Sequence, residues 1–228
     1  MIMSGKVAIV TGASEGIGRA IVEKLVEREV TVVAVSRSVA NHAFGSAFVY
    51  EKGSDVRDYR SVRELFDWVE TKFGKLDILI NNAGVWQKTG QLEDIPDDEI
   101  ANVLATNLVG TINMTKAGLP HLRKAEEAAI VNVISKSGVV AQAGQSIYTA
   151  SKYGVRGFTD VLREDVKATN IHIMAVYQSG TNTEMFAKAG EDFSTNEFTE
   201  PADLAEAIVS AVASPDKFWV KELHVDRR

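Results

Sequence analysis

Short apolar runs alternate along this 228-residue chain with stretches of helical periodicity. The apolar runs are rich in β-branched residues and lie at 6–10, 31–36, 47–50, 77–80, 129–134, 171–177 and 218–223. The helical stretches lie at about 17–28, 59–73, 97–124, 148–168 and 201–213. Strands that are apolar throughout are typical of a parallel sheet covered by helices on both faces. The alternation therefore predicts an α/β fold, a doubly wound parallel sheet of about seven strands.

Composition limits the functions open to such a fold. Apolar residues make up 45% of the chain and charged residues 25%, which suits one large domain over 1–228. The net charge is −6 and no basic stripe occurs, so we expect no nucleic-acid partner. Without cysteine, and with only scattered histidines, no metal centre is expected. No apolar run approaches 18 residues and no leader is evident, so we expect a cytoplasmic protein with no membrane association.

A glycine-rich turn, TGASEGIG at 11–18, lies between the first strand and the first helix. Glycines there permit a tight turn and let the backbone approach a pyrophosphate, and the helix supplies free N–H groups. Three glycines alone are weak evidence because many turns use glycine, but the strand–turn–helix context strengthens the prediction. The sequence therefore predicts a Rossmann-type dinucleotide site. Its candidate residues in this turn are Gly12, Ser14, Glu15, Gly16, Ile17 and Gly18.

Two further motifs accompany the turn, NNAG at 81–84 and YTASK at 148–152. With the G-x-x-x-G-x-G spacing of the turn, they resemble the short-chain dehydrogenase/reductase family, in the expected order and over almost the whole chain. The resemblance implies an NAD(P)-dependent oxidoreductase that interconverts a carbonyl and an alcohol by hydride transfer. It also implies a small-molecule substrate and a homodimer or homotetramer paired through the helices at 97–124 and 148–168.

Tyr148 and Lys152 are four residues apart on an expected helix, so both side chains project from one face. A free tyrosine has a pKa of about 10. A neighbouring ammonium favours the phenolate, so we expect Lys152 to lower the pKa of Tyr148 toward the range of a general acid/base. The plainer interpretation is an ordinary solvated helix face, and the accompanying motifs favour the catalytic one.

Two other residues complete the catalytic set that the resemblance implies. Ser135, thirteen residues before Tyr148, matches a serine that hydrogen-bonds the substrate oxygen. Ser137 is a rival, and a strand-end serine can also simply cap a turn. Asn107 matches an asparagine that holds a water linking the lysine to solvent. Asparagine is a mediocre helix former, so a position inside a helix needs a reason, although an exposed polar residue is the alternative.

The end of the second strand bears on the choice of cofactor. Ser36 occupies the position of the usual acidic residue and Arg37 follows it, which suits a 2′-phosphate because guanidinium binds phosphate with a matching fork. Against this, Glu15 lies where many NADP-binding relatives carry a basic residue. The sequence therefore favours NADP(H), with NAD(H) possible.

The remaining cofactor positions come from the resemblance. Asp55, followed by Val56, resembles the aspartate that bonds the adenine amine, although a turn aspartate is the alternative. The segment Asn82-Ala83-Gly84 is expected beside the adenosine ribose. Thr183 is the candidate for the carboxamide contact. The Pro-Gly that relatives carry after the sixth strand is missing from Gln178-Ser179-Gly180.

The substrate itself is not readable beyond a ketone, aldehyde or secondary alcohol. Residues 184–200 are expected to form a substrate lid, with Trp86, Met185, Phe186 and Phe193 as apolar contacts or as packing. Two other functions are open. The chain could be a redox sensor that binds the dinucleotide without turnover, or an epimerase or dehydratase that uses transient hydride transfer.

Overall fold

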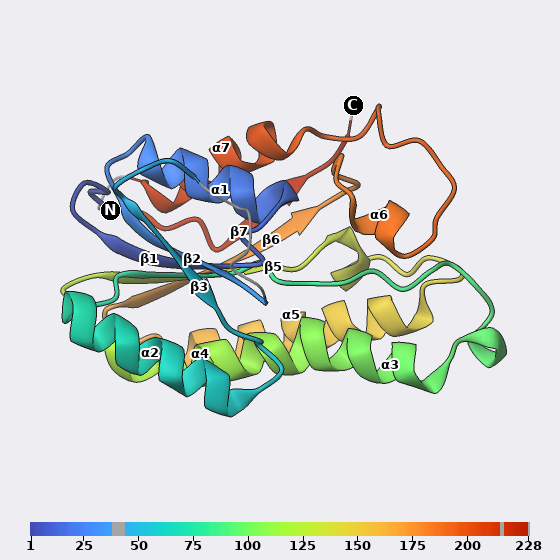
Figure 1. Ribbon diagram of the computed structural model, residues 1–228, viewed down its shortest axis with the longest axis horizontal. Coiled ribbons are helices and arrows are strands. Elements are labelled where there is room, and N and C mark those ends of the chain that lie inside the picture. The colour runs from blue at the N-terminus through green and yellow to red at the C-terminus, as the bar shows by residue number, and fades with distance from the viewer. Residues whose placement is uncertain (38–43, 215–216, 228) are drawn as a thin grey trace.

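The computed structural model describes residues 1–37, 44–214 and 217–227 and contains one seven-stranded sheet, which is parallel throughout (Figure 1). The strands are β1 (Val7–Thr11), β2 (Thr31–Ser36), β3 (Val49–Gly53), β4 (Ile78–Asn81), β5 (Ala128–Val133), β6 (Ile171–Gln178) and β7 (Glu222–Val225). Their order in the sheet is β3-β2-β1-β4-β5-β6-β7. The order reverses between β1 and β4, and open α/β sheets bind ligands in the crevice that such a reversal leaves.

Helices cover the sheet on both faces, as Figure 1 shows. On one face α1 (Gly16–Val26) and α7 (Pro201–Val212) pack on the even-numbered residues of β1 and β6, such as Val10 and Val176. On the other face lie α2 (Tyr59–Phe73), α4 (Gly110–Leu122) and α5 (Ser146–Val166). Because both faces are buried, β1, β4 and β5 are buried along their whole length. This arrangement confirms the predicted Rossmann-type fold class.

The helix expected at 97–124 is interrupted. It consists of α3 (Asp97–Leu104), a π-helical turn η2 (Ala105–Val109) and α4, so one wide turn separates two α-helical parts. The Asn107 side chain faces inward from this turn and is buried. Single π turns occur frequently at functional sites.

The last strand was expected at 218–223 and the structure places it later, at Glu222–Val225. Before this strand, Trp219 packs against β6 instead of pairing in the sheet. The Trp219 ring stacks on His172 with centroids 5.2 Å apart, and its Nε1 donates to the carbonyl of Ile173 at 3.0 Å. The apolar composition of residues 218–223 therefore predicted a strand where only the last part of the segment joins the sheet.

The segment expected to be irregular, 178–200, includes one short helix, α6 (Met185–Lys188), and an isolated parallel bridge between Thr181 and Thr199. In Figure 1 it arches over the carboxyl end of the sheet. Across the residues that the structure describes, no helix has the length and apolar character needed to cross a bilayer.

Candidate active site

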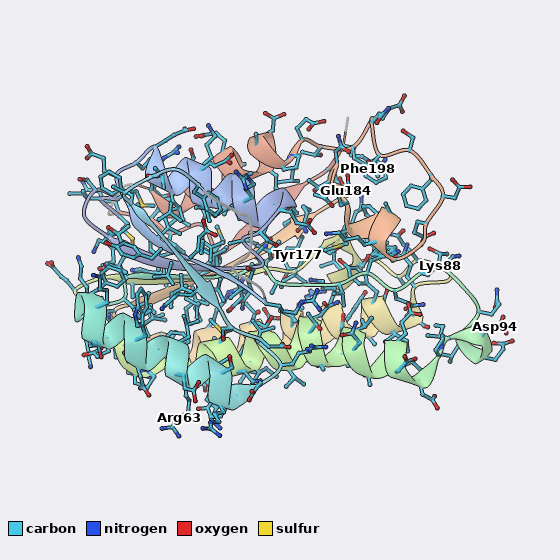
Figure 2. All side chains as sticks on the ribbon, in the orientation of Figure 1. Arg63, Lys88, Asp94, Tyr177, Glu184 and Phe198 are labelled. Atoms are coloured by element: carbon cyan, nitrogen blue, oxygen red, sulfur yellow. The ribbon has the colours of Figure 1, made fainter. Side chains whose placement is uncertain are left out.

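A cleft of about 1070 Å³ opens at the carboxyl ends of the strands and is lined by most of the residues predicted from the sequence. Figure 2 shows Lys88, Glu184 and Phe198, from two distant segments, at this end of the molecule. The predicted residues that line the cleft are Gly12, Ser14, Glu15, Gly16, Ile17, Ser36, Arg37, Asp55, Val56, Asn82, Ala83, Gly84, Ser135, Tyr148, Lys152 and Thr183. Gly18 and Asn107 lie behind its wall.

The glycine turn is shaped by backbone contacts that leave no room for side chains. Gly12 and Gly16 have φ of +65° and +54°, a region that favours glycine. A Cβ on Gly18 would lie 2.2 Å from the carbonyl oxygen of Gly12, so the helix packs directly on the turn. The sequence assigned Gly18 to cofactor binding, whereas its contact in the structure is with the turn.

The threonine that precedes these glycines ties the turn to the next strand. The Thr11 hydroxyl accepts hydrogen bonds from the backbone N–H groups of Asn82 and Ala83, each at 3.0 Å, and donates to the carbonyl of Ile80. In return the Asn82 amide donates to the Thr11 carbonyl at 2.9 Å. Thr11 was missed at the sequence level, although its place before the first glycine was visible.

A phosphate-bearing group fits the turn. The Glu15 side chain makes no capping bond at the start of α1, so it leaves the N–H groups of the first turn without a side-chain cap. Those groups and the helix dipole suit an anion. A Cβ on Gly12 would come within 2.9 Å of the Ala83 Cα, so the backbone forms a close cradle that only glycine permits. The residues present therefore fit a dinucleotide pyrophosphate.

The Glu15 carboxylate forms an ion pair with Lys188 of α6. This lysine supplies, from the end of α6, the positive charge that was missing beside the turn. Both side chains are about half exposed, so the pair adds little to stability. It does offset the negative charge that argued against a phosphorylated cofactor.

At the other end of the cleft, Asp55 and two arginines lie together. The Arg57 guanidinium bonds the Asp55 carboxylate from Nε and Nη2, at 3.0 and 2.6 Å. These bonds, with a smaller contribution from Arg37, hold the pKa of Asp55 below its usual range. The predicted adenine contact of Asp55 would therefore share a carboxylate that Arg57 already engages.

Tyr148 lies in the first turn of α5 and is buried beside Ser135. Burial raises the pKa of the phenol to about 12, and a hydrogen bond with Ser135 opposes that rise only in part. The sequence-based expectation that Lys152 lowers the pKa of Tyr148 is therefore wrong for this structure, because loss of water around the phenol outweighs the opposing contribution of Ser135. At neutral pH the phenol is protonated.

Ser135 and its rival Ser137 have different partners. The Ser135 hydroxyl accepts from the Ser137 N–H at 3.2 Å and lies beside the Tyr148 phenol, whose pKa it lowers, whereas the Ser137 hydroxyl donates to Gln145 at 3.3 Å. Ser135 also has a φ of +129°, which a residue with a Cβ adopts at a cost of about 1–3 kcal/mol. Strain of this kind clusters at functional sites, and no sequence signal marked it.

Lys152 is also buried, one turn along the helix. Its Nζ lies 5.5 Å from the centre of the Tyr148 ring and donates to the carbonyl of Val133 at 3.3 Å. Burial lowers its pKa to about 8, so the ammonium form predominates only modestly at neutral pH. At neutral pH the pair thus consists of a neutral Tyr148 phenol and a Lys152 ammonium whose pKa lies close to neutrality.

Asn107 makes a closed set of contacts behind the cleft. Its Oδ1 accepts from the Val85 N–H at 2.8 Å, and its Nδ2 donates to the Val85 carbonyl and to the Ser151 hydroxyl at 3.0 and 3.1 Å. Ser151 in turn donates to the Tyr148 carbonyl at 2.6 Å. The alternative of an exposed polar residue is therefore wrong, and Asn107 connects the loop after β4 to the helix that carries Tyr148.

Gln87 holds the start of the same helix and was missed at the sequence level. Its side chain is fully buried, and Oε1 accepts from the N–H groups of Ile147 and Tyr148 at 2.8 and 3.0 Å. Its Nε2 donates to the Gly144 carbonyl at 3.1 Å. The cap comes from a residue 60 positions away instead of from Gln145, so local sequence rules gave no signal.

An aromatic cluster joins the segment 184–200 to the cleft. The Trp86 ring lies 4.4 Å from that of Tyr148 and 4.9 Å from that of Phe186, measured between centroids. Glu191 accepts from the Trp86 indole N–H at 2.8 Å and from the N–H and hydroxyl of Thr89 at 2.8 and 2.7 Å. The segment 184–200 therefore contacts the loop after β4 both through ring packing and through hydrogen bonds to the Glu191 carboxylate.

Comparison with known proteins agrees with this geometry. The family model for short chain dehydrogenases matches residues 6–193. The chain is 34% identical to a 3-oxoacyl-(acyl-carrier-protein) reductase of Vibrio harveyi, over 99% of this chain and 98% of the relative. It is 31% identical to carbonyl reductase family member 4 of Xenopus tropicalis, over 92% of each chain.

A solved structure shows the same architecture. The 3-ketoacyl-(acyl-carrier-protein) reductase of Brucella melitensis, complexed with NADH, superposes with a TM-score of 0.88 at 27% identity. The similarity covers 98% of each chain, so it includes the sheet, the helices and the cleft.

The Gln87 cap makes a prediction about stability. In Gln87→Met two buried N–H groups at the start of α5 lose their acceptor, and each unpaired group costs about 1–3 kcal/mol. We expect the free energy of unfolding in urea to fall by about 2–4 kcal/mol. Gln91→Met, at an exposed loop position, is the control and should change it by less than about 0.5 kcal/mol. Equal stability of the two variants would contradict the assignment.

The buried ammonium makes a prediction about pH. Below pH 8 Lys152 is charged and buried, which costs roughly 3 kcal/mol from its lowered pKa. Lys152→Met should therefore raise the free energy of unfolding at pH 7, by about 1–3 kcal/mol. Between pH 8 and 10.5 Lys152 is deprotonated in the folded wild type but stays protonated in the unfolded chain. The free energy of unfolding of the wild type therefore rises over this range, and the difference between it and that of Lys152→Met becomes smaller.

Urea unfolding at pH 7 and at pH 9.5 measures this difference. Lys167→Met, at a largely exposed position just after the same helix, is the control and should show little change in stability at either pH. If the free energies of unfolding of Lys152→Met and the wild type differed by the same amount at both pH values, burial of the ammonium would not be the cause of the difference.

Proposed function

This chain belongs to the short-chain dehydrogenase/reductase family of NAD(P)-dependent oxidoreductases, and we propose that Tyr148 transfers the proton in its reaction. The observation that carries the proposal is the buried Tyr148 phenol, which lies beside the Ser135 hydroxyl and one helical turn from the Lys152 side chain. Both relatives named above are reductases, which supports turnover over the sensor and epimerase alternatives.

The proposed reaction is reduction of a carbonyl. When bound, the nicotinamide supplies the hydride to the carbonyl carbon. The hydroxyls of Ser135 and Tyr148 bind the carbonyl oxygen and stabilise the charge that develops on it. Tyr148 then donates its phenolic proton to that oxygen. A phenol with a pKa of about 12 is protonated at neutral pH and is therefore ready to act as the acid.

Lys152 and Asn107 have supporting roles in the proposal. The Lys152 amine, with a pKa near 8, shifts toward the charged form as a phenolate develops one turn away, and so favours proton loss from Tyr148. It would also hold the ribose next to the nicotinamide when the cofactor is bound. Asn107 holds the loop after β4 and the Tyr148 helix in register, and it is the candidate that connects the lysine to solvent.

We propose NADP(H) as the favoured cofactor. Arg37 lies at the adenosine end of the cleft, and Arg57 lies beside Asp55 at the same end. Guanidinium groups suit a 2′-phosphate. The ion pair between Glu15 and Lys188 removes the main objection to it.

The substrate is proposed to be a ketone or aldehyde with an apolar part. The rings of Trp86, Phe186, Phe193 and Phe198 form a cluster that lines the cleft and reaches the Tyr148 ring through Trp86, and they suit such a group. We propose that the segment 184–200 acts as the substrate lid, because it contributes three of these rings.

We also propose a homo-oligomer in the cytoplasm. The outer surfaces of η2 and α5 expose Val109, Tyr153 and Val161, which are large apolar side chains on adjacent helices. Pairing of two copies through these helices would bury them.

Tyr148→Phe tests the proposed role. Loss of a positioned acid typically costs a factor of about 10²–10⁴, so kcat on a panel of ketones, aldehydes and 3-oxoacyl thioesters should fall by that factor. Cofactor affinity should stay within about twofold, because the ring remains. Tyr50→Phe, on β3 and outside the cleft, is the control and should keep full activity. Turnover that survives in Tyr148→Phe would refute the role.

Cofactor preference is tested at Arg37. We expect kcat/KM with NADPH to exceed that with NADH by at least tenfold in the wild type. Arg37→Ala should lower the NADPH value by about tenfold or more, because a charged hydrogen bond to phosphate is lost, and leave the NADH value nearly unchanged. Arg63→Ala, on α2 and outside the cleft lining, is the control; Figure 2 shows Arg63 projecting from the lower edge of the molecule. A tenfold preference for NADH would overturn the proposal.

A further inference from the structure

Gln178 ends β6 with a side-chain oxygen that has no partner. Its Oε1 is buried and makes no hydrogen bond with any group of the protein, and the residue lines the cleft. Buried acceptors are rarely left unpaired in folded proteins, because each loses its hydrogen bonds to water without replacement. The proline that relatives carry after this strand could not present such an atom. The glutamine is thus a feature of this chain that calls for a ligand.

The position of Gln178 along the strand places it beside the catalytic residues. β6 runs parallel to β5, with Val176 paired to Val133. The carbonyl of Val176 accepts from the N–H of Ser135 at 3.3 Å. Gln178 lies two residues further along the same strand, at the level of the strained Ser135 backbone.

Its side chain lies on the face of the sheet that carries α1. Met174 and Val176 pack in the cluster that includes residues of α1 and α7, and alternate residues of a strand share a face. Thr183 reaches the same region, since its Cγ2 lies 3.0 Å from where a Cβ on Gly16 would stand. Gln178 therefore contributes to the wall between Ser135 and the first turn of α1.

We propose that the Gln178 amide turns toward the cleft when the cofactor binds, and that its Oε1 then accepts a hydrogen bond from the carboxamide N–H of the nicotinamide ring. The inference rests on the proposed function, which places the ring beside Tyr148 and the pyrophosphate at the first turn of α1. The carboxamide is the N–H donor of that ring, whereas a carbonyl substrate offers none, and the adenine amine belongs near Asp55. Gln178 is thus a specificity-determining residue that distinguishes a carboxamide from groups without an N–H donor.

A chemical double-mutant cycle tests the bond. Calorimetry measures the Kd of wild type and Gln178→Met for the oxidised cofactor, NAD⁺ or NADP⁺, whichever the wild type binds more tightly. The same titrations use its 3-acetylpyridine analogue, in which a methyl ketone replaces the carboxamide. We expect the wild type to bind the analogue about fivefold more weakly than the cofactor, as the loss of one hydrogen bond implies. In Gln178→Met the two ligands should bind equally well.

Two controls separate this effect from general damage to the site. ADP-ribose, or its 2′-phosphate, lacks the nicotinamide and should bind Gln178→Met within twofold of the wild type. Gln91→Met should behave as the wild type with every ligand. The melting temperature of Gln178→Met without ligand should not fall, because the lost oxygen had no partner.

The inference would be overturned if the ratio of the Kd of the analogue to that of the cofactor were the same in the wild type and in Gln178→Met. It would also be overturned if the wild type bound both ligands equally well. The second comparison needs no variant, so it holds even if Gln178→Met fails to fold. Failure of the wild type to bind either dinucleotide would instead overturn the proposed function, and the inference with it. Binding of the cofactor without coupling to Gln178 would leave the proposed function intact.

Discussion

The hydroxyl of Thr11 holds the ends of β1 and the segment after β4 together, and the cleft depends on this link. It accepts from two successive backbone N–H groups and donates to the carbonyl of Ile80. The neighbouring glycines then pack against Asn82 and Ala83 with no room for a Cβ. A parallel sheet brings the carboxyl ends of its strands to one edge, but contacts of this kind determine how closely a ligand can approach the backbone there.

Exclusion of water is the second constraint, and it acts on Tyr148 and Lys152 in opposite directions. Burial favours the neutral form of each group, so it raises the pKa of the phenol and lowers that of the amine. Both shifts disfavour a phenolate–ammonium ion pair. At neutral pH the site therefore holds a proton on the phenol oxygen of Tyr148.

The sequence predicted the sheet and the approximate place of the cleft, because burial on both faces leaves an unmistakable pattern of apolar strands. It could not predict effects that depend on distant contacts. The cap on α5 comes from Gln87, and the packing of Trp219 on His172 displaces the start of β7. The sign of the Tyr148 pKa shift depends on how much water the fold removes, which spacing along a helix does not report.

The π-helical turn at Ala105–Val109 has a consequence for how the helices pack. A wide turn takes in one residue more than an α-helical turn, and one residue corresponds to about 100° of rotation. The segments on either side are thereby out of phase, so α3 contacts α5 whereas α4 contacts α2 and β4. Removing one residue here would give an unbroken α-helix but would turn Met114 and Thr115 out of the core. The π-helical turn thus sets the orientation of α4 relative to α3. Inserting or deleting one residue there would change which side chains of α4 face the core.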